Sequence, residues 1–517
     1  MVLGTSSHVG KSLLTAALCR IFAQEGYRVA PFKSQNMSLN SAVTPDGLEI
    51  GRAQAFQAEA AGILPSVHMN PILLKPSGDM TSQVVVLGKI WGKLSASDYH
   101  LRRVKELLPL VCESYEILAS QNDIIILEGA GSPAEINLKQ HDIVNMRMAE
   151  LAGAACLLVG DIDRGGVFAS LLGTVELMDP SERALIAGFL INKFRGDVRL
   201  LEPGVRMIEE RLGKPSLGVV PFLPHLSLDE EDSLGLPSLD TDNALIWQSS
   251  DDPTRALRIA VIALPTFSNF TDFDALRAEP CVSVRFCRTS EQLTYADVII
   301  IPGSKQTADD LSWLRSEGLD KLIGGHAGKG LIVGICGGMQ MLGKEIADPH
   351  GMENSATIAG LDLLAIHTTM QPQKVTRISS GQFLMPTLFG QPIVPLCISG
   401  YEIHVGDTHY LQGAQPFARL SAESDKRSFF DGCIAGDNHT FGTYLHGLFD
   451  DDSFRHAFLI AARAASGLTT PNHLNNWKQQ REASLNRLTD IVRTSLDLPK
   501  VFSWVGLTYD SRERKER

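Results

Sequence analysis

The sequence predicts an α/β protein with two doubly wound domains, each built on a mainly parallel sheet. Two observations support this fold class. Continuous apolar runs that end in polar or Gly-rich residues alternate with helix-length segments in both halves of the chain, and such runs are typical of strands buried on both faces of a parallel sheet. An acidic, aperiodic stretch at 225–254 separates the halves. We therefore expect domains at 1–225 and 257–455, a linker at 226–256 and a helical segment at 456–517.

The composition is that of a soluble protein without a large basic surface. The 517 residues carry a net charge of -12, which argues against a general nucleic-acid or anionic-membrane binder. Eight cysteines without CxxC or metal-type spacing predict reduced thiols and a cytoplasmic location. No apolar run approaches the roughly 20 residues of a transmembrane helix, and the N-terminus lacks the basic region of a signal peptide. The oligomeric state is left open, a homo-oligomer included.

A phosphate-binding loop is predicted at the start of the chain. A very short strand leads into GTSSHVGKS, residues 4–12, and a helix-like segment follows. Backbone N–H groups of such a loop bind phosphate oxygens, the lysine adds a mobile charge, and the Ser12 hydroxyl can hold Mg²⁺. Five residues, instead of the usual four, separate the first Gly from the Gly-Lys pair. The residues expected to contact a nucleotide are Gly4, Thr5, Ser6, Gly10, Lys11 and Ser12.

Polar residues follow the other strands predicted in this domain. Glu128 ends the run NDIIILEG and is placed to bind Mg²⁺ directly or through water. Asp161 ends a further strand and is a candidate for substrate contact. Asn192 ends the next strand and is a candidate for contact with a nucleotide base. Glu49 or Asp46, at the start of a segment that we interpret as a helix (47–62), is a candidate second metal ligand.

The run KSQNMSLNS, residues 33–41, follows a short strand at 29–32. Ligands bind at the carboxyl ends of strands in α/β sheets. Lys33, Gln35 and Asn36 are therefore candidates to hold the carboxylates of a substrate. A capped, solvated loop is the alternative interpretation.

The second domain contains a predicted nucleophile elbow, LIVGICGGMQMLG, residues 331–343. A strand, a tight Gly-rich turn and a helix place Cys336 at the apex. The helix dipole there favours the reactive thiolate. A buried cysteine in a Gly-rich turn is the alternative.

A cysteine nucleophile needs a base that is close in space but not in sequence. His446, at the end of a strand-like stretch and followed by a glycine, is our preferred candidate. The backbone N–H of Gly337 is expected to stabilise an oxyanion, with a second donor from the turn at Gly303 and Ser304. Glu402 is a candidate to bind substrate or to orient a base. The alternative bases are His404, His409 and His439.

These motifs together resemble the cobyric and cobyrinic acid synthase branch of the class I glutamine amidotransferases, and cobyric acid synthases in particular. The segments that carry the resemblance are GTSSHVGKS, KSQNMSLNS, EGAGSPAEINL, VGDIDRGGVF, INKFRGD, GICGGMQMLG and YLHGLF. The resemblance implies a dethiobiotin-synthetase-like domain that uses ATP and Mg²⁺, and a flavodoxin-like domain in which Cys336 and His446 hydrolyse glutamine. It also implies a corrinoid substrate, adenosylcobyrinic acid a,c-diamide, amidated at its b, d, e and g side chains.

The chain departs from the usual class I pattern at one position. Most class I glutaminases have a Glu two residues after the histidine, and here that position is Leu448. What orients His446 is thus left open, and a weaker or more tightly gated glutaminase is expected. The alternative functions are a cobyrinic acid a,c-diamide synthase, a ParA-like ATPase with an inactive amidotransferase module, and a carboxylase of the dethiobiotin synthetase type.

Overall fold

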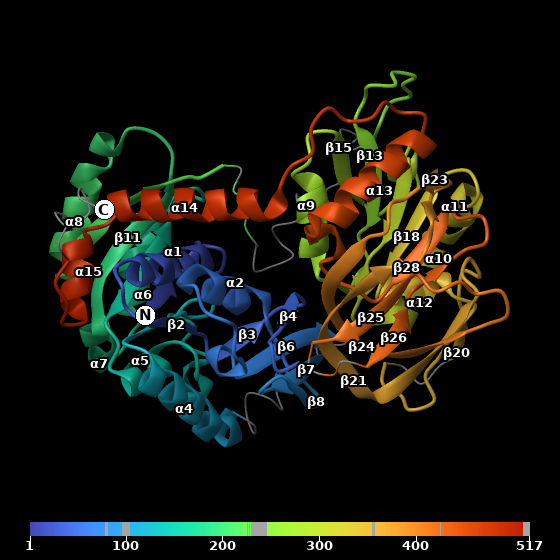
Figure 1. Cartoon of the computed structure of the whole chain (residues 1–517). Coiled ribbons are helices and arrows are strands. Elements are labelled where there is room, and N and C mark those ends of the chain that lie inside the picture. Colours follow the sequence, from blue (N-terminus) through green and yellow to red (C-terminus); the bar gives the residue numbers. More distant parts are fainter. Residues whose placement is uncertain are drawn as a thin grey trace.

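Two α/β lobes form the molecule in a computed structural model (Figure 1). The structure describes residues 1–77, 81–95, 104–224, 226, 228, 246–353, 357–423, 425 and 427–509. Most of the predicted linker, with its acidic run at 229–232, lies outside these residues. Within the described ranges, none of the helices combines the length and the hydrophobicity needed to cross a bilayer.

The first lobe is built on parallel strands, as the buried apolar runs predict. The main sheet has the order β1 (Val2–Gly4), β10 (Cys156–Asp161), β11 (Ile186–Phe194) and β12 (Ser216–Pro221). A parallel pair, β2 (Val29–Phe32) and β9 (Ile124–Leu127), adjoins β1 through a bridge between Val2 and Glu128. Because all these strands are parallel, the polar residues after them gather at one edge.

Seven helices of the described first lobe accompany these strands. They are α1 (Lys11–Gln24), α2 (Arg52–Ala61), α4 (Val104–Gln121), α5 (Met146–Ala152), α6 (Val167–Glu176), α7 (Pro180–Leu185) and α8 (Glu202–Leu212). Helix α1 begins directly after the Gly-rich loop, as predicted. The segment at 47–62 differs from the prediction of a helix, because its first part is strand β5 (Glu49–Gly51).

Short strands extend the first lobe toward the second (Figure 1). One sheet has the order β3 (Gln35–Met37), β6 (Ile72–Ser77), β7 (Thr81–Val86) and β8 (Lys89–Ser95), and β4 (Ser41–Val43) pairs with β5. The hairpin β4–β5 packs against the second lobe, where Val43 lies in one apolar cluster with Tyr401 and Ile403.

The second lobe has a six-stranded sheet that is parallel except for its last strand. Its order is β15 (Val282–Cys287), β13 (Leu257–Ile262), β16 (Val298–Ile301), β18 (Leu331–Ile335), β28 (Thr440–Thr443) and β27 (Cys433–Ile434). The associated helices are α9 (Asp274–Arg277), α10 (Thr307–Ser316), α11 (Leu319–His326), α12 (Gly337–Leu342) and α13 (Asp452–Ala465). The predicted α/β fold class is confirmed in both lobes.

A second, mostly antiparallel sheet belongs to this lobe. It contains β20 (Thr357–Ala359), β19 (Glu345–Ala347), β21 (Ile366–Phe383), β24 (Cys397–Tyr410), β25 (Ala418–Ala422) and β26 (Ser428–Asp431). Strand β24 carries Glu402 and His404.

The end of the chain returns to the first lobe. A final helix is predicted at 481–496; the structure has α14 (Trp477–Ser495) and a further helix, α15 (Leu498–Trp504). Helix α14 runs from the second lobe across to the first (Figure 1), where Leu488 is buried in the core beside α1. Phe502 of α15 stacks on Phe22 at a centroid distance of 4.3 Å. The two lobes are therefore tied together by the chain's last helices.

Candidate active sites in the two lobes

Cys336 lies at the sharp turn between β18 and α12, as the elbow pattern predicts. Its backbone adopts φ 51° and ψ -109°, a conformation that is strained for a residue with a side chain. The turn fits only because glycines follow: a Cβ on Gly338 would lie 1.9 Å from the carbonyl oxygen of Ile301. The cysteine is 6% exposed and lines a small cavity between the lobes.

His446 contacts Cys336 and is held by Asp272. The Nδ1–H of His446 donates to Oδ2 of Asp272 at 2.7 Å, and the second carboxylate oxygen accepts from the N–H of Gly447 at 2.9 Å. With Nδ1 bound to Asp272, Nε2 is the ring nitrogen left for proton exchange. The Cys336 thiol donates to the Ile403 carbonyl at 3.7 Å and interacts electrostatically with the imidazole. Burial by itself lowers the pKa of His446, but the Asp272 carboxylate and Cys336 outweigh it and raise the pKa to about 10.

Asp272 is the functional residue that the sequence analysis missed. It lies in a 3₁₀ turn (Phe270–Phe273) after β13, 174 residues before His446. The position two residues after the histidine, Leu448, is buried in the core. A weaker glutaminase was expected because no residue was identified to orient His446. Asp272 provides the carboxylate that orients it.

Glu402 does not orient His446. It is bound by Arg377 at 2.7 Å and by the Ser379 hydroxyl at 2.7 Å, and its pKa falls to about 2 because hydrogen bonds from His404 and Arg377 outweigh the effect of burial. His404 is fixed by Glu402 and by the carbonyl of Gly406, although it lines the cavity with Cys336. His409 is paired loosely with Asp407 at the surface. His446 interacts electrostatically with Cys336, which makes it the preferred base.

The turn predicted to hold an oxyanion lies directly beside the elbow. A Cβ added to Gly337 would lie 2.9 Å from the backbone nitrogen of Ser304. Gly303 instead lies against the imidazole, because a Cβ there would be 3.1 Å from Cε1 of His446. The Ser304 hydroxyl donates to Asp310 at 2.6 Å, which fixes the turn. Gly337 and Ser304 thus present adjacent backbone nitrogens next to Cys336.

In the first lobe, Glu128 lies at the centre of the candidate phosphate and metal site. It accepts hydrogen bonds from Ser12 Oγ at 2.8 Å, from Lys33 Nζ at 2.9 Å and from the Gln57 amide. Lys11 Nζ donates to the carbonyls of Ser6 and Gly131, both at 3.1 Å. Gln57, on α2, was not identified from sequence. The predicted residues Lys11, Ser12, Lys33 and Glu128 are therefore brought together at the P-loop.

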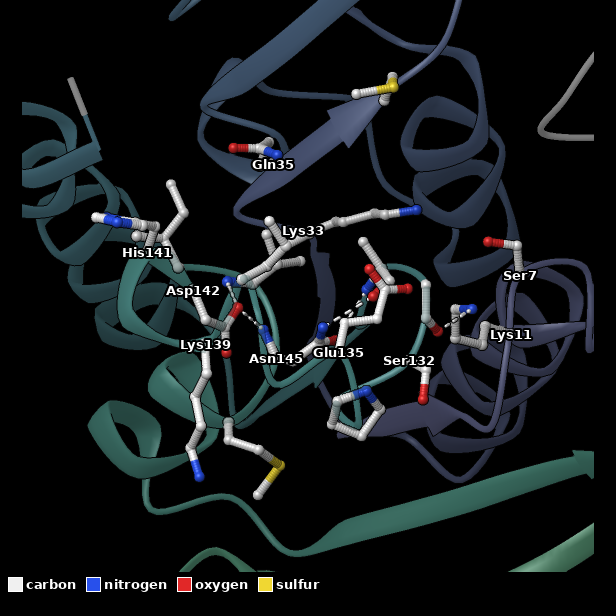
Figure 2. Close-up of a pocket in the computed structure, with 18 of the residues that line it drawn as sticks. Ser7, Lys11, Lys33, Gln35, Ser132, Glu135, Lys139, His141, Asp142 and Asn145 are labelled. Atoms are coloured by element: carbon white, nitrogen blue, oxygen red, sulfur yellow. Dashed lines mark hydrogen bonds between the residues drawn. The ribbon is translucent and has the colours of Figure 1, made fainter. Parts of the chain in front are cut away.

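A cavity opens beside this cluster and is lined by the predicted substrate residues (Figure 2). Lys33, Gln35 and Asn36 line it, together with Lys11. Further lining residues that the sequence analysis did not single out are Met37, Glu135, Leu138, Lys139, His141, Asp142 and Asn145. The cavity thus combines cationic, amide and apolar groups next to the phosphate-binding lysine.

Three predicted residues make contacts with other residues of the chain. Asp161 is not among the lining residues of this cavity; it accepts from Lys193 Nζ at 2.9 Å. Glu49 is not near the P-loop, because it is buried between Lys75 and Lys374. The Asn192 amide donates to the Val9 carbonyl at 2.8 Å and so supports the P-loop backbone.

A second cavity near the P-loop is shared by both lobes. Gly10, Asn192 and Phe222 line it from the first lobe, and Phe270 and Arg277 line it from the second. The end of the P-loop and the segment that carries Asp272 therefore border the same cavity.

Hydrogen bonds join the segment that carries Asp272 to the polar run at residues 33–41, which is predicted to bind substrate. Asn40 Oδ1 accepts from the N–H of Phe270 at 3.1 Å, and Asn269 Oδ1 accepts from the N–H of Ser41 at 2.9 Å. Asn269 has φ 53°, a left-handed conformation that asparagine tolerates. The segment whose Asp272 binds His446 is therefore hydrogen-bonded to the first lobe.

Comparisons with known proteins identify the family of the chain and of each lobe. Residues 258–454 match the CobB/CobQ-like glutamine amidotransferase domain, and residues 1–235 match the CobQ/CobB/MinD/ParA nucleotide binding domain. The chain is 48% identical to a cobyric acid synthase of Moorella thermoacetica over 98% of this chain and 97% of that protein. It is also 48% identical to the cobyric acid synthase of a Thermoanaerobacter species over 97% of each chain, and 46% identical to that of Clostridium botulinum over 98% and 99%.

Proposed function

This chain belongs to the cobyric acid synthase family, and on this basis we propose a division of chemistry between its two lobes. It is an enzyme of cobalamin biosynthesis that carries out glutamine-dependent amidation. The second lobe releases ammonia from glutamine, and the first lobe activates the carboxylates that ammonia attacks. The observation that carries the proposal is the Cys336–His446–Asp272 arrangement beside a backbone pair suited to an oxyanion.

In the second lobe, Cys336 Sγ attacks the side-chain carbonyl of glutamine. His446, whose raised pKa favours its protonated form, holds the thiol proton on Nε2 and passes it to the departing ammonia. Asp272 keeps the imidazole in the required tautomer and stabilises its protonated form. The N–H groups of Gly337 and Ser304 or Gly303 stabilise the oxyanion, and water then hydrolyses the glutamyl thioester.

In the first lobe, the Gly-rich loop and Lys11 bind the phosphates of ATP. The Ser12 hydroxyl and the Glu128 carboxylate are adjacent hard oxygen groups, and this donor set suits Mg²⁺. When bound, the metal ion neutralises phosphate charge. The chain's own contribution is to hold the nucleotide in place with the P-loop and to keep Lys33 next to Glu128.

The corrinoid binds in the cavity lined by Lys33, Gln35 and Asn36. Lys33 lies between that cavity and the P-loop, so a substrate carboxylate bound there is next to the nucleotide phosphates. Attack of the carboxylate oxygen on the terminal phosphorus of ATP gives an acyl phosphate and releases ADP, and ammonia then displaces phosphate to form the amide. The apolar side chains of Met37 and Leu138 suit the face of a corrin ring. The substrate is adenosylcobyrinic acid a,c-diamide, amidated at the b, d, e and g positions.

Two further points complete the proposal. All eight cysteines are unpaired, which suits a reducing compartment such as the cytoplasm. An a,c-diamide synthase would use the same chemistry on other carboxylates, but the full-length relatives named above are cobyric acid synthases.

The test is to incubate the protein with ATP, Mg²⁺, glutamine and adenosylcobyrinic acid a,c-diamide and to follow the corrinoid by mass spectrometry. We expect a stepwise series that ends in the tetra-amidated product. In Cys336→Ala, ammonia should support the series and glutamine should not. An unchanged corrinoid with continued glutamine hydrolysis would rule out the proposed substrate.

A further inference from the structure

The cavity that contains Cys336 is lined by charged groups that hydrolysis of an amide does not need. Lys75, Lys305, Glu353 and Lys374 all line it beside the thiol. They come from both lobes, since Lys75 is on β6 and the others belong to the second lobe. Each charged group in such an enclosed space requires a partner or a ligand.

Two of the lysines already have a partner. Glu49 accepts from Lys75 Nζ at 2.8 Å through one oxygen and from Lys374 Nζ through the other. These two lysines hold the pKa of Glu49 well below its usual range, against the effect of its burial. The three residues form a closed ion-pair group across the lobe interface.

Lys305 and Glu353 differ from that group. In the described part of the chain, the Lys305 ammonium makes no hydrogen bond or ion pair, and it does not pair with Glu353. Glu353 is held at the start of α10, where it accepts from the Thr307 hydroxyl and the Ala308 N–H, both at 3.2 Å. One cation and one anion thus line the same cavity as the nucleophile without neutralising each other.

The titration of these two groups reflects their burial in this cavity. Burial, followed by the charges of Lys374 and Lys75, lowers the pKa of Lys305 to about 7. Burial raises the pKa of Glu353 to about 7, although the Ala308 N–H and Lys305 oppose it. A ligand with one positive and one negative group would favour the charged form of both residues.

We propose that Lys305 and Glu353 form the subsite for the head group of the substrate amino acid. Lys305 pairs with the α-carboxylate, and Glu353 pairs with the α-ammonium group. A zwitterion held at these two points places its side-chain amide at Cys336 Sγ. This inference rests on the proposed glutaminase function, and it makes the pair the determinant that selects glutamine over simpler primary amides.

The test compares ammonia release from three amides in the full-length protein. Glutamine has both head groups, glutaramate lacks the α-ammonium group, and glutamine α-amide lacks the α-carboxylate. The wild-type protein should prefer glutamine by about 10- to 100-fold in kcat/KM, the range of a charged hydrogen bond. In Glu353→Gln, the preference over glutaramate should fall to a few-fold while the preference over the α-amide stays. Lys305→Met should give the reverse pattern.

Controls separate recognition from damage to the fold. Lys344→Met and Glu345→Gln change exposed charges of the same lobe and should leave both preferences unchanged. Ammonia-dependent amidation should be normal in all four variants. An equal loss of kcat/KM for the three amides, or a wild-type protein that does not distinguish them, would overturn the subsite. Absence of glutamine hydrolysis in the wild-type protein would instead overturn the proposed function itself.

Discussion

The proposed phosphate-binding site and the proposed glutaminase site are assembled in opposite ways. The first uses mainly backbone groups and side chains from one run, residues 4–12, with Glu128 as its main distant partner. The second uses three side chains, Cys336, His446 and Asp272, from positions spread over 174 residues. A site built on a contiguous loop depends on local backbone geometry, whereas the glutaminase site depends on how the whole lobe folds.

The largest effects are expected when the nucleophile Cys336 or the phosphate-binding residue Lys11 is removed, because each change should abolish one activity and spare the other. Cys336→Ala should lower glutamine hydrolysis by about 10⁶-fold, the effect of deleting a catalytic nucleophile, and should leave ammonia-dependent amidation intact. Lys11→Ala should do the opposite, with amidation lowered by about 10²- to 10³-fold and hydrolysis largely kept. Separate assays of released glutamate and of amidated corrinoid measure both. Loss of both activities in either variant would contradict independent sites.

The role of Asp272 is sharpened by Asp272→Asn, which keeps the shape and removes the charge. We expect glutamine hydrolysis to fall by about 10³- to 10⁴-fold, as when the orienting carboxylate of a catalytic triad is replaced. Burial lowers the pKa of His446, but Asp272 and Cys336 raise it to about 10. Without the Asp272 charge this pKa should fall, so the alkaline limb of the pH–rate profile should move to lower pH. Asp251→Asn, at an exposed position, is the matched control.

The same pKa predicts a stability effect with a definite sign. Folding raises the pKa of His446 above the roughly 6.5 of an exposed histidine. Its protonation therefore stabilises the folded protein fully below about pH 6.5, and this contribution is lost as the pH rises through about 10. The Tm difference between the wild-type protein and Asp272→Asn should narrow over that interval. A difference that is independent of pH would contradict the His446–Asp272 ion pair.

A smaller effect is expected at the proposed metal site of the first lobe. Ser12→Ala removes the hydroxyl that lies 2.8 Å from Glu128 and should lower amidation by about 100-fold. It should also raise the Mg²⁺ concentration needed for half-maximal activity, which a titration of the metal measures. Glutamine hydrolysis without a corrinoid is the internal control, and an equal loss there would argue against a metal role for Ser12.

Much of the fold and of the first site could be predicted from sequence for a physical reason. Buried parallel strands require continuous apolar runs, and a phosphate loop requires glycines at fixed spacing. The position of Cys336 follows from the same logic, since no Cβ fits at Gly338. Each of these features depends on residues that are close together in the sequence.

Asp272 could not be predicted because no local pattern identifies it. Its partner is 174 residues away, and the usual position of a third member holds Leu448. The only signal was a polar and acidic run after β13. Glu49 was misjudged for a related reason: its two lysines lie on β6 and β21, which only the folded chain brings together.

The smallest effect is expected where the two sites meet. Asn40→Ala removes the acceptor for the Phe270 N–H, a bond from the substrate loop to the turn that carries Asp272. Asp272 in this turn orients His446. We therefore expect the kcat for glutamine to fall by about 10-fold, the cost of roughly one hydrogen bond in a buried contact, with little change in KM. Asn472→Ala, at an exposed position, is the control. If kcat is unchanged while corrinoid binding weakens, Asn40 serves the first lobe alone, and its hydrogen bond to Phe270 does not connect the two sites.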